Sequence, residues 1–431
     1  MGGGITIQKI ITQFEQTVKQ ICAVYTSFFL WYNIRQTLNR PQGRTLPGRR
    51  GMMQKLRRTL AEFFQQADLV LLGLCCAATV FGIILIFSAT RYQDSNRSVL
   101  VQSVALMLGI CVYIFFSMLD LELLMKRWKW IVAFNVVLIA LLITPFGVET
   151  AGNRAWLRFP LVPVYIGPAE FVKITFTLLL AKQIAWLKDD RRDLQSFRSA
   201  LTAGGHAALL MGYYVVISGD MGNALTFFFI FLCMTFVAGF ALRWFALLLF
   251  GGGGAMLAAG MTGLIPEYMM ERFLILFDHS IDPLGKGWQQ TRSLLAIGSG
   301  GLFGQGYMNG TQTQSSFLQN LPARHTDLIF SVCGEEFGLL GCLLVMALLV
   351  AVIARVLLVA KHARSTYHCC ICVGVAAMLI YQTVVNIGMC LFVMPVIGVT
   401  LPFFSYGGSS VVTLYMAMGV VSGIKKRTSL R

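Results

Sequence analysis

Apolar segments of membrane-spanning length recur along most of this 431-residue chain. A helix needs about 20 mostly apolar residues to cross the hydrocarbon core of a bilayer. Segments of that kind lie at about 69–89, 99–119, 130–147, 168–187, 201–218, 221–239, 243–264, 328–358, 369–394 and 404–424. The pattern predicts an all-α polytopic membrane protein with about ten transmembrane helices.

The composition excludes an ordinary soluble protein. Hydrophobic residues make up 56% and charged residues 13% of the chain, whereas soluble proteins carry roughly 25% charged residues. The eleven cysteines lie almost entirely within apolar segments. We therefore expect them to be helix-packing residues, and we expect neither a disulfide framework nor a zinc site.

The net charge of +16 is unevenly placed. In a soluble chain such an excess would suggest a nucleic-acid partner. Here 25 of the 35 Lys and Arg residues lie on the same side of the membrane as the N-terminus when the predicted spans are followed along the chain. Ten of them lie within residues 1–67. The positive-inside rule then places both termini in the cytoplasm. The excess of basic residues therefore indicates how the chain is oriented in the membrane, and we expect no nucleic-acid partner.

The chain divides into three parts. Residues 1–67 form a basic cytoplasmic arm, in which apolar residues between Ile7 and Tyr32 recur at helical spacing. This pattern predicts an amphipathic helix on the membrane surface, with a short extra span as the alternative. Residues 68–424 form the membrane domain, and 425–431 form a basic cytoplasmic tail. Within the membrane domain, residues 265–327 form a long external loop between the seventh and eighth spans, and loops of that length are usually functional.

Two charged residues near the outer end of the fourth span stand out, because ionisable groups within a bilayer are costly. Glu170 and Lys173 are three residues apart and share one helix face. They can form a neutralising ion pair within the helix bundle. Alternatively, they line a polar cavity in which the ammonium of Lys173 holds an anionic lipid headgroup. Arg355 lies nearer the cytoplasmic end of its span, where extension of the side chain to water suffices as an explanation.

Two aspartates occupy outer turns. Asp220 lies between the fifth and sixth spans, and Asp327 lies where the long loop enters the eighth span. Either can be a helix N-cap, and for the eighth span Thr326 is an equal candidate. A carboxylate at the position of Asp327, with hydrocarbon on one side and water on the other, can instead have a raised pKa and act as a general base. The adjacent Glu335 and Glu336 point to different helix faces, so they do not form a catalytic pair with each other.

Short motifs follow one another in order from about 69 to 424. They are Gly167-Pro-Ala-Glu-Phe-Val-Lys173, Asp220-Met-Gly222, Asp282-Pro-Leu-Gly-Lys-Gly287, Ala296-Ile-Gly-Ser-Gly-Gly301, Gly304-Gln-Gly306, His325-Thr-Asp-Leu-Ile-Phe330, Gly334-Glu-Glu336, Asn386-Ile-Gly-Met389 and Leu401-Pro-Phe-Phe-Ser-Tyr-Gly-Gly-Ser-Ser410. Taken together, they resemble the SEDS (shape, elongation, division and sporulation) family of bacterial peptidoglycan glycosyltransferases of RodA, FtsW and SpoVE type. Gly310-Thr-Gln-Thr-Gln followed by Phe317 is most similar to the RodA branch.

The resemblance implies ten helices in the bacterial cytoplasmic membrane and a large external loop between spans seven and eight. It implies that Asp327 is the essential catalytic residue, and that Glu170, Lys173 and Asp220 line or support a central cavity. The chain departs from the family pattern at Ser218, Gly219, Asn223, Trp288 and Arg292. These departures concern the surroundings of Asp220 and a loop helix near 287–300.

The implied reaction polymerises lipid II at the outer membrane face. Asp327 would take the proton from the acceptor 4-hydroxyl as that oxygen attacks the donor's anomeric carbon, with undecaprenyl pyrophosphate leaving. Candidate countercharges for the pyrophosphate are a divalent cation, Mg²⁺ or Mn²⁺, and several basic side chains. The basic candidates are Lys173, Arg154, Arg158, Arg272 and Arg292.

The segment from Ser405 to Ser409 is a further candidate contact for the substrate lipid. Its Gly407 and Gly408 allow close approach, either to the lipid or to a neighbouring helix. The resemblance also implies a class B penicillin-binding protein, a transpeptidase, as partner.

Two other functions stay open at this point. A flippase for the lipid-linked precursor would also need charged groups in its spans, but its polar path would begin on the cytoplasmic side. Glu170, Lys173, Asp220 and Asp327 all lie toward the outer face, which favours the enzyme. A scaffold that only binds a partner enzyme would not depend on Asp327.

Overall fold

The computed structural model describes residues 67–91, 96–150, 152–159, 165–189, 193–262, 286–315 and 321–429. The predicted surface helix in residues 1–67 and Arg272 lie outside these ranges.

Helices make up most of the described residues, with one two-stranded antiparallel hairpin. The long helices are α3 (Leu69–Thr90), α4 (Arg97–Met118), α6 (Trp128–Ala140), α7 (Pro168–Asp189), α8 (Phe197–Ser218), α9 (Met221–Ala238), α10 (Leu242–Met261), α12 (Lys286–Ser299), α13 (Ile329–His362), α14 (Thr366–Cys390) and α15 (Gly408–Ser429). The shorter elements are α5 (Leu121–Met125), the 3₁₀ turn η2 (Leu141–Ile143), β1 (Gly147–Thr150) and β2 (Asn153–Leu157).

Six helices in the described part of the chain are long and apolar enough to cross a membrane, namely α3, α4, α8, α9, α13 and α14. Two shorter apolar stretches, Trp128–Ile143 and Leu242–Gly254, lie in predicted spans. The class of the fold is therefore the predicted one, a mainly helical membrane protein. Helix α15 continues to Ser429, so the basic residues after 424 extend the last helix.

The predicted span at 130–147 is wrong at its C-terminal end. Helix α6 ends at Ala140, one 3₁₀ turn follows, and β1 begins at Gly147. Pro145 explains the stop, because the residue before a proline is disfavoured in helical conformation. The hairpin β1–β2 that follows was not predicted, since its strands are only four and five residues long.

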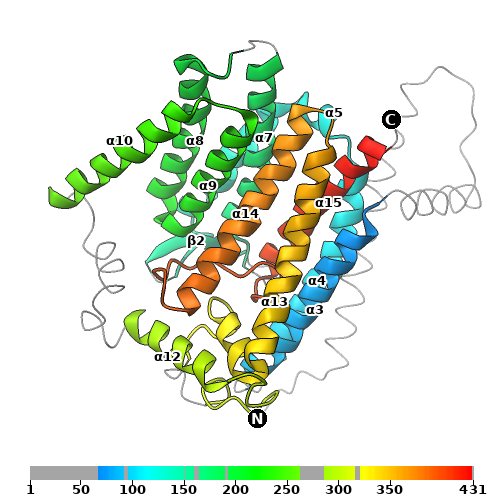
Figure 1. Cartoon of the computed structure of the whole chain (residues 1–431), viewed down its shortest axis with the longest axis vertical. Coiled ribbons are helices and arrows are strands. Elements are labelled where there is room, and N and C mark those ends of the chain that lie inside the picture. Colours follow the sequence, from blue (N-terminus) through cyan, green and yellow to red (C-terminus); the bar gives the residue numbers. More distant parts are fainter. Residues whose placement is uncertain are drawn as a thin grey trace, which may run out of the picture. The chain divides into compact units, whose positions relative to one another are not determined.

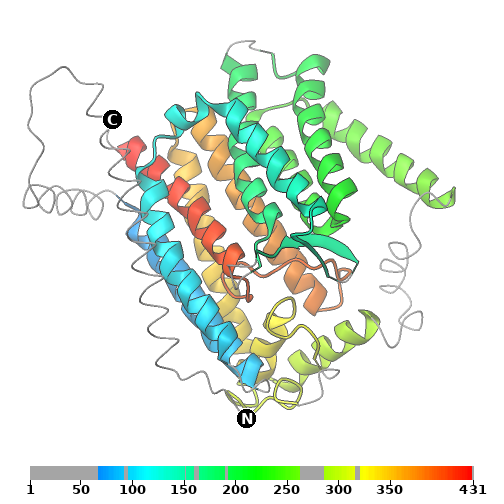
Figure 2. The same cartoon turned by 180° about the vertical axis from the view of Figure 1, so that it is seen from behind.

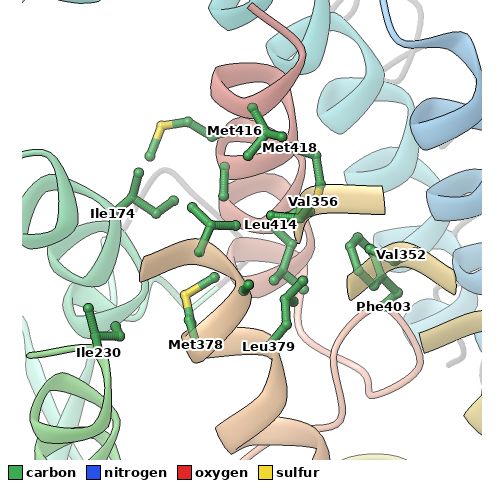
Figure 3. Close-up of a cluster of buried hydrophobic side chains, with 14 of the residues drawn as sticks. Ile174, Ile230, Val352, Val356, Met378, Leu379, Phe403, Leu414, Met416 and Met418 are labelled. Atoms are coloured by element: carbon green, nitrogen blue, oxygen red, sulfur yellow. The ribbon is translucent and has the colours of Figure 1, made fainter. Parts of the chain in front are cut away.

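The helices pack around α14. Helices α7, α9 and α13 lie against it, α3 lies against α13, and α4 lies along α15, so that segments far apart in sequence are neighbours (Figures 1 and 2). Apolar side chains from α7, α9, α13, α14 and α15 meet in the centre (Figure 3). Because lipid is as apolar as these side chains, close van der Waals packing is what holds such helices together.

Small residues bring α4 and α15 into close contact. A Cβ atom added at Gly419 would lie 2.6 Å from the carbonyl oxygen of Tyr113, and one at Gly423 would lie 2.8 Å from that of Ser117. These glycines are four residues apart and therefore on one helix face. Larger side chains would push the two backbones apart, so this is the small-residue packing typical of membrane helices.

Helix α13 is broken at Gly338, which has a left-handed backbone conformation (φ 65°). The turn formed by residues 300–306 fits into this break. Gln305 and Gly306 donate their amides to the carbonyls of Glu335 and Glu336, and the amides after Gly338 donate to carbonyls of the same turn. The break therefore leaves these backbone groups hydrogen-bonded, as hydrocarbon requires.

A buried aspartate at the N-terminal end of α3 connects this helix to two others. Asp68 has no exposed surface, and its carboxylate lies 2.8 Å from Nε of Arg355 in α13 and 3.2 Å from Nζ of Lys425 in α15. Burial by itself raises the pKa of Asp68, but the two cations outweigh it and hold the pKa below its ordinary value. Arg355 thus has a specific partner in Asp68. The expectation that this side chain merely extends to water at the end of its span is therefore wrong.

We predict that Asp68→Asn lowers the free energy of unfolding by roughly 2–3 kcal/mol, because it leaves two cations without their buried partner. The midpoint of thermal unfolding in detergent measures the effect. The matched control is Asp120→Asn, since Asp120 is exposed and pairs with Arg427 at 3.5 Å. That exposed pair should contribute less than about 1 kcal/mol. Equal losses in both variants would contradict the prediction.

Candidate functional site

Asp327 lies immediately before α13 and is not its cap. The N-cap residue is Leu328, and no side chain makes the capping hydrogen bond. Thr326 instead donates its hydroxyl to the carbonyl of Ala323. Asp327 is half-buried, and its carboxylate has no hydrogen bond or ion pair with any residue in the described ranges. The capping alternative is therefore wrong here, and the carboxylate is available for chemistry.

The backbone at this point is held by the connection between α14 and α15. Three consecutive carbonyls accept hydrogen bonds. The amide of Tyr406 donates to His325 O (2.9 Å), and the hydroxyl of Ser405 donates to Thr326 O (2.6 Å). The third bond runs from Asn386 Nδ2 to Asp327 O (2.8 Å). We call these three bonds the carbonyl clamp. It fixes the main chain of Asp327 while leaving its side chain unengaged.

Asn386 is the part of the clamp that comes from within a helix. It is fully buried in α14, and its Nδ2 also donates to Val399 O at 2.8 Å. Both amide hydrogens therefore face carbonyls, which determines the orientation of the amide group. The sequence placed Asn386 in a motif but assigned it no role, because only the tertiary structure brings it to Asp327, 59 residues earlier in the chain.

Arg324, three residues before Asp327, attaches the same segment to the preceding loop. This side chain is 1% exposed and donates to the carbonyls of Thr313 and Ser315. The loop it contacts is fixed in turn by Glu335, which accepts hydrogen bonds from the amides of Gln312 (2.7 Å) and Thr313 (2.8 Å).

Glu336, the other acid of this pair, instead accepts from Ser88 and Gln314. The two adjacent acids therefore have separate partners, as their helical positions predicted.

Asp220 is the N-cap of α9, so for this residue the capping alternative is confirmed. Its Oδ1 accepts from the amide of Asn223, and its Oδ2 accepts from the side chain of Asn223 (2.7 Å) and from the hydroxyl of Tyr214 (3.1 Å). Ser218 accepts a hydrogen bond from the amide of Asp220, and Gly219 has the left-handed conformation that ends α8. The departures at Ser218, Gly219 and Asn223 thus form one consistent turn around Asp220.

The charge of Asp220 affects the pKa of Asp327. Burial raises the pKa of Asp327 from 3.8 to about 6, and the negative charge of Asp220 adds to that rise. A carboxylate with this pKa is mostly ionised at neutral pH and is a stronger base than an ordinary aspartate. That is the property expected of a general base near neutral pH.

Glu170 and Lys173 form the ion pair that the sequence offered as one alternative. The distance from Nζ to Oε1 is 2.8 Å, and Lys173 has no exposed surface. The start of α15 packs beside them, because Ser410 reaches Glu170 at 3.5 Å and Ser409 accepts the amide of Gly167. These contacts make the pair a neutral polar element next to the start of α15. Binding of a substrate phosphate by Lys173 stays a prediction.

The segment from Ser405 to Ser409, a candidate contact for the substrate lipid, makes hydrogen bonds to other parts of the protein. Ser405 joins the carbonyl clamp and also accepts the amide of Leu401. The amide of Gly407 donates to Gln102 of α4, and Gly408 is the first residue of α15. Their direct contact with the substrate stays a prediction, but their structural role is to hold this connection against α4 and Asp327.

The predicted arginines are dispersed. Arg154 is exposed and pairs with Glu149 at 3.7 Å, and Arg158 is exposed just after β2. Arg292 stacks on Trp288 at 4.0 Å, so these two departures from the family pattern face each other within α12.

Arg97 was not among the candidates but lies near the clamp. Burial raises the pKa of Tyr406, and the charge of Arg97 opposes that rise. Arg97 was missed because it begins α4, far in sequence from every motif.

A resident metal centre has little support in the side chains of the described ranges. They contain no cluster of three or more His, Cys, Asp or Glu residues placed to hold a metal ion. Asp220 and Asp327 interact electrostatically, but the oxygens of Asp220 already accept three hydrogen bonds.

The sequence matches a family described as "Cell cycle protein", that of FtsW, RodA and SpoVE, over residues 66–430. Stage V sporulation protein E of Bacillus subtilis is 29% identical over 83% of this chain and 97% of its own length. Peptidoglycan glycosyltransferase MrdB of Escherichia coli K12 is 30% identical over 83% and 93%. A probable peptidoglycan glycosyltransferase FtsW of Trichlorobacter lovleyi is 31% identical over 86% and 96%.

Solved structures agree with this match. A chain from the structure titled "Structural coordination of polymerization and crosslinking by a peptidoglycan synthase complex" superimposes with a TM-score of 0.69 at 28% identity, covering 85% of this chain and 99% of that one. The rod shape determining protein RodA of Thermus thermophilus superimposes with a TM-score of 0.59 at 27% identity, covering 83% and 96%. The similarity thus extends over the whole described membrane domain.

We predict that Asp327 titrates near pH 6 and that Asp220→Asn lowers its pKa without restoring it to 3.8, because burial remains. Infrared difference spectra of the protonated carboxyl band measure the titration, with Asp327→Asn used to assign the band. Asp193→Asn is the control, since Asp193 is exposed and caps a distant turn. Titration of Asp327 near pH 4 in the unmodified protein would contradict the prediction.

Proposed function

This chain belongs to the FtsW, RodA and SpoVE family and is a peptidoglycan glycosyltransferase, and we propose that Asp327 is the general base of its polymerising reaction. The observation that supports this role most directly is the unengaged carboxylate of Asp327 on a main chain held by the carbonyl clamp. The family assignment decides between the enzyme and the flippase that the sequence left open.

The proposed reaction joins lipid II to a growing glycan strand. The carboxylate of Asp327 accepts the proton of the acceptor 4-hydroxyl as its oxygen forms a bond to the anomeric carbon of the donor sugar. The bond from that carbon to the pyrophosphate oxygen breaks, the configuration inverts, and undecaprenyl pyrophosphate leaves. One carboxylate suffices, because pyrophosphate leaves without protonation, whereas a glycosidase must protonate a sugar alkoxide.

The departing pyrophosphate requires positive charge. We assign this role first to Lys173, whose buried ammonium would exchange its ion pair with Glu170 for the pyrophosphate. Mg²⁺ commonly binds through one or two carboxylates together with the phosphates of a substrate. Asp220 and Asp327 are the carboxylates that would hold a Mg²⁺ or Mn²⁺ ion brought in with the pyrophosphate, and such an ion would supply positive charge beside the leaving group.

The membrane arrangement that fits this chemistry has ten spans. It adds α6, α7, α10 and α15 to the six strongly apolar helices, with both termini in the cytoplasm and the residues between α10 and α13 outside. Asp327 then faces the outer side of the bacterial cytoplasmic membrane, where lipid II is consumed. A class B penicillin-binding protein, which crosslinks strands, is the partner that suits a polymerase at this face.

We predict that Asp327→Asn and Asp327→Ala each reduce polymerisation of labelled lipid II by 10²-fold or more, roughly the contribution of a general base. In the unmodified enzyme kcat/KM should fall as the pH drops through about 6, because the protonated carboxyl accepts no proton. Thr326→Ala is the control, as it alters the neighbouring side chain but keeps the clamp. Polymer formed equally by all variants would refute the general-base role.

We further predict that Asn386→Leu lowers kcat by tenfold or more with KM changed less than threefold, because loss of its two donors releases the main chain of Asp327. Initial rates over a range of lipid II concentrations separate the two constants. The control is Gln290→Leu, which removes a buried side chain that donates to Met389 O and Met394 O but not to the Asp327 segment. Loss of kcat of the same size in both variants would show a general packing effect instead.

A further inference from the structure

A cavity of about 220 Å³ lies at the end of the bundle away from Asp327. Its walls come from three separate places in the chain: the end of α7, the end of α9 and the turn from α13 into α14. The lining residues are Lys188, Val237, Ala238, Ala363, Arg364, Ser365, Thr366, Cys369 and Cys370. The volume is several times the roughly 30 Å³ that one water occupies in the liquid, so a molecular group of some size fits.

The charged lining residues are both cations. Lys188 and Arg364 are exposed, and neither has an ion pair or hydrogen bond with any residue in the described part of the chain. The acid next to Lys188, Asp189, is exposed and does not line the cavity. Two cations that share one cavity and have no acidic partner among the described residues repel each other, and an anion between them would remove that repulsion.

Polar groups suited to phosphate complete the cavity. Thr366, which carries a hydroxyl, is one of the lining residues, and Ser365 there already accepts the amide of His368 as the cap of α14. The cavity also meets the N-terminal end of this 25-residue helix, whose dipole adds positive potential. Val237, Ala238 and Ala363 add an apolar wall to the lining. The lining therefore combines cations and hydroxyl-bearing residues with apolar surface, which suits a group that has both an anionic and an apolar part.

The position of the cavity agrees with a membrane boundary. Lys188 is 18 residues beyond Glu170 along α7, which corresponds to about 27 Å at 1.5 Å per residue. The hydrocarbon core of a bilayer is about 30 Å thick. Because Glu170 lies in the first turn of α7, on the side of Asp327, Lys188 and the cavity lie at the headgroup level of the opposite leaflet.

We propose that this cavity binds the phosphate of an anionic glycerophospholipid from the leaflet opposite the catalytic face. Lys188 and Arg364 hold the phosphate, Thr366 donates a hydrogen bond to it, and the apolar wall contacts the glycerol and upper acyl carbons. Basic pockets between transmembrane helices on the cytoplasmic side recognise lipid headgroups in this way. The commitment to a lipid rather than a free anion follows from the apolar wall and the depth of the cavity.

The test is native mass spectrometry of the full-length protein titrated with phosphatidylglycerol in detergent. The double variant Lys188→Gln with Arg364→Gln should bind the first lipid about tenfold or more weakly, since one cation near an anionic headgroup contributes about fivefold in affinity. The matched control, Lys126→Gln with Lys129→Gln, removes the same charge from exposed positions outside the cavity. Its affinity should stay within twofold of the unmodified protein.

A second variant distinguishes the effect of the cavity's size on lipid binding from the effect of its charge. Ala363→Leu narrows the cavity and keeps both cations, so it should also weaken binding. Unchanged binding in Ala363→Leu, unchanged binding in the Lys188 and Arg364 variant, or equal losses in the control pair would each overturn the proposal. Displacement of phosphatidylglycerol by inorganic phosphate at equal concentration would show a site for the free anion instead. Equal affinity for phosphatidylcholine, which has no net charge, would show that the site does not select an anionic lipid and would also overturn the proposal.

Discussion

Backbone hydrogen bonding in hydrocarbon is the constraint on which the rest of this structure depends. A peptide group that faces lipid without a partner costs several kcal/mol, so irregular backbone persists only where other parts of the protein bind it. Helix α13 illustrates this constraint. Its break at Gly338 is stable because the turn at 300–306 supplies donors and acceptors to the separated ends. That turn in turn leads into the loop that Glu335 and Arg324 hold, and so the break and the site are parts of one hydrogen-bonded unit.

The same constraint explains why the carboxylate of Asp327 can stay without a hydrogen-bond partner among the described residues. Three consecutive carbonyls before α13 are satisfied by Tyr406, Ser405 and Asn386, so the main chain needs no help from the side chain of Asp327. In the turn before α9 the opposite holds. There Asp220 caps the helix with its own carboxylate and has little capacity left. Two aspartates that each precede a helix thus have different contacts, because different groups satisfy the backbone next to each.

Buried charged side chains in this protein likewise have partners of opposite charge. Within the bundle Lys173 is neutralised by Glu170, and Asp68 by Arg355 and Lys425. A sequence pattern predicted the first pair, since its members are three residues apart on one helix. The second joins residues 287 positions apart, and no periodicity connects them. Spacing along a helix therefore predicts contacts within that helix, whereas contacts between helices need the packing.

The sequence by itself determined the class of this protein, most helix boundaries, the family and the aspartate on which the chemistry is proposed to depend. These follow from hydropathy, prolines, caps and motifs, which are properties of contiguous residues. Only the tertiary structure decided that Asp220 is a cap and Asp327 is not, that Asn386 and Ser405 hold the main chain at Asp327, and that Gly338 breaks α13. Each of these depends on which distant backbone group meets a donor or acceptor, and that is settled when the helices pack.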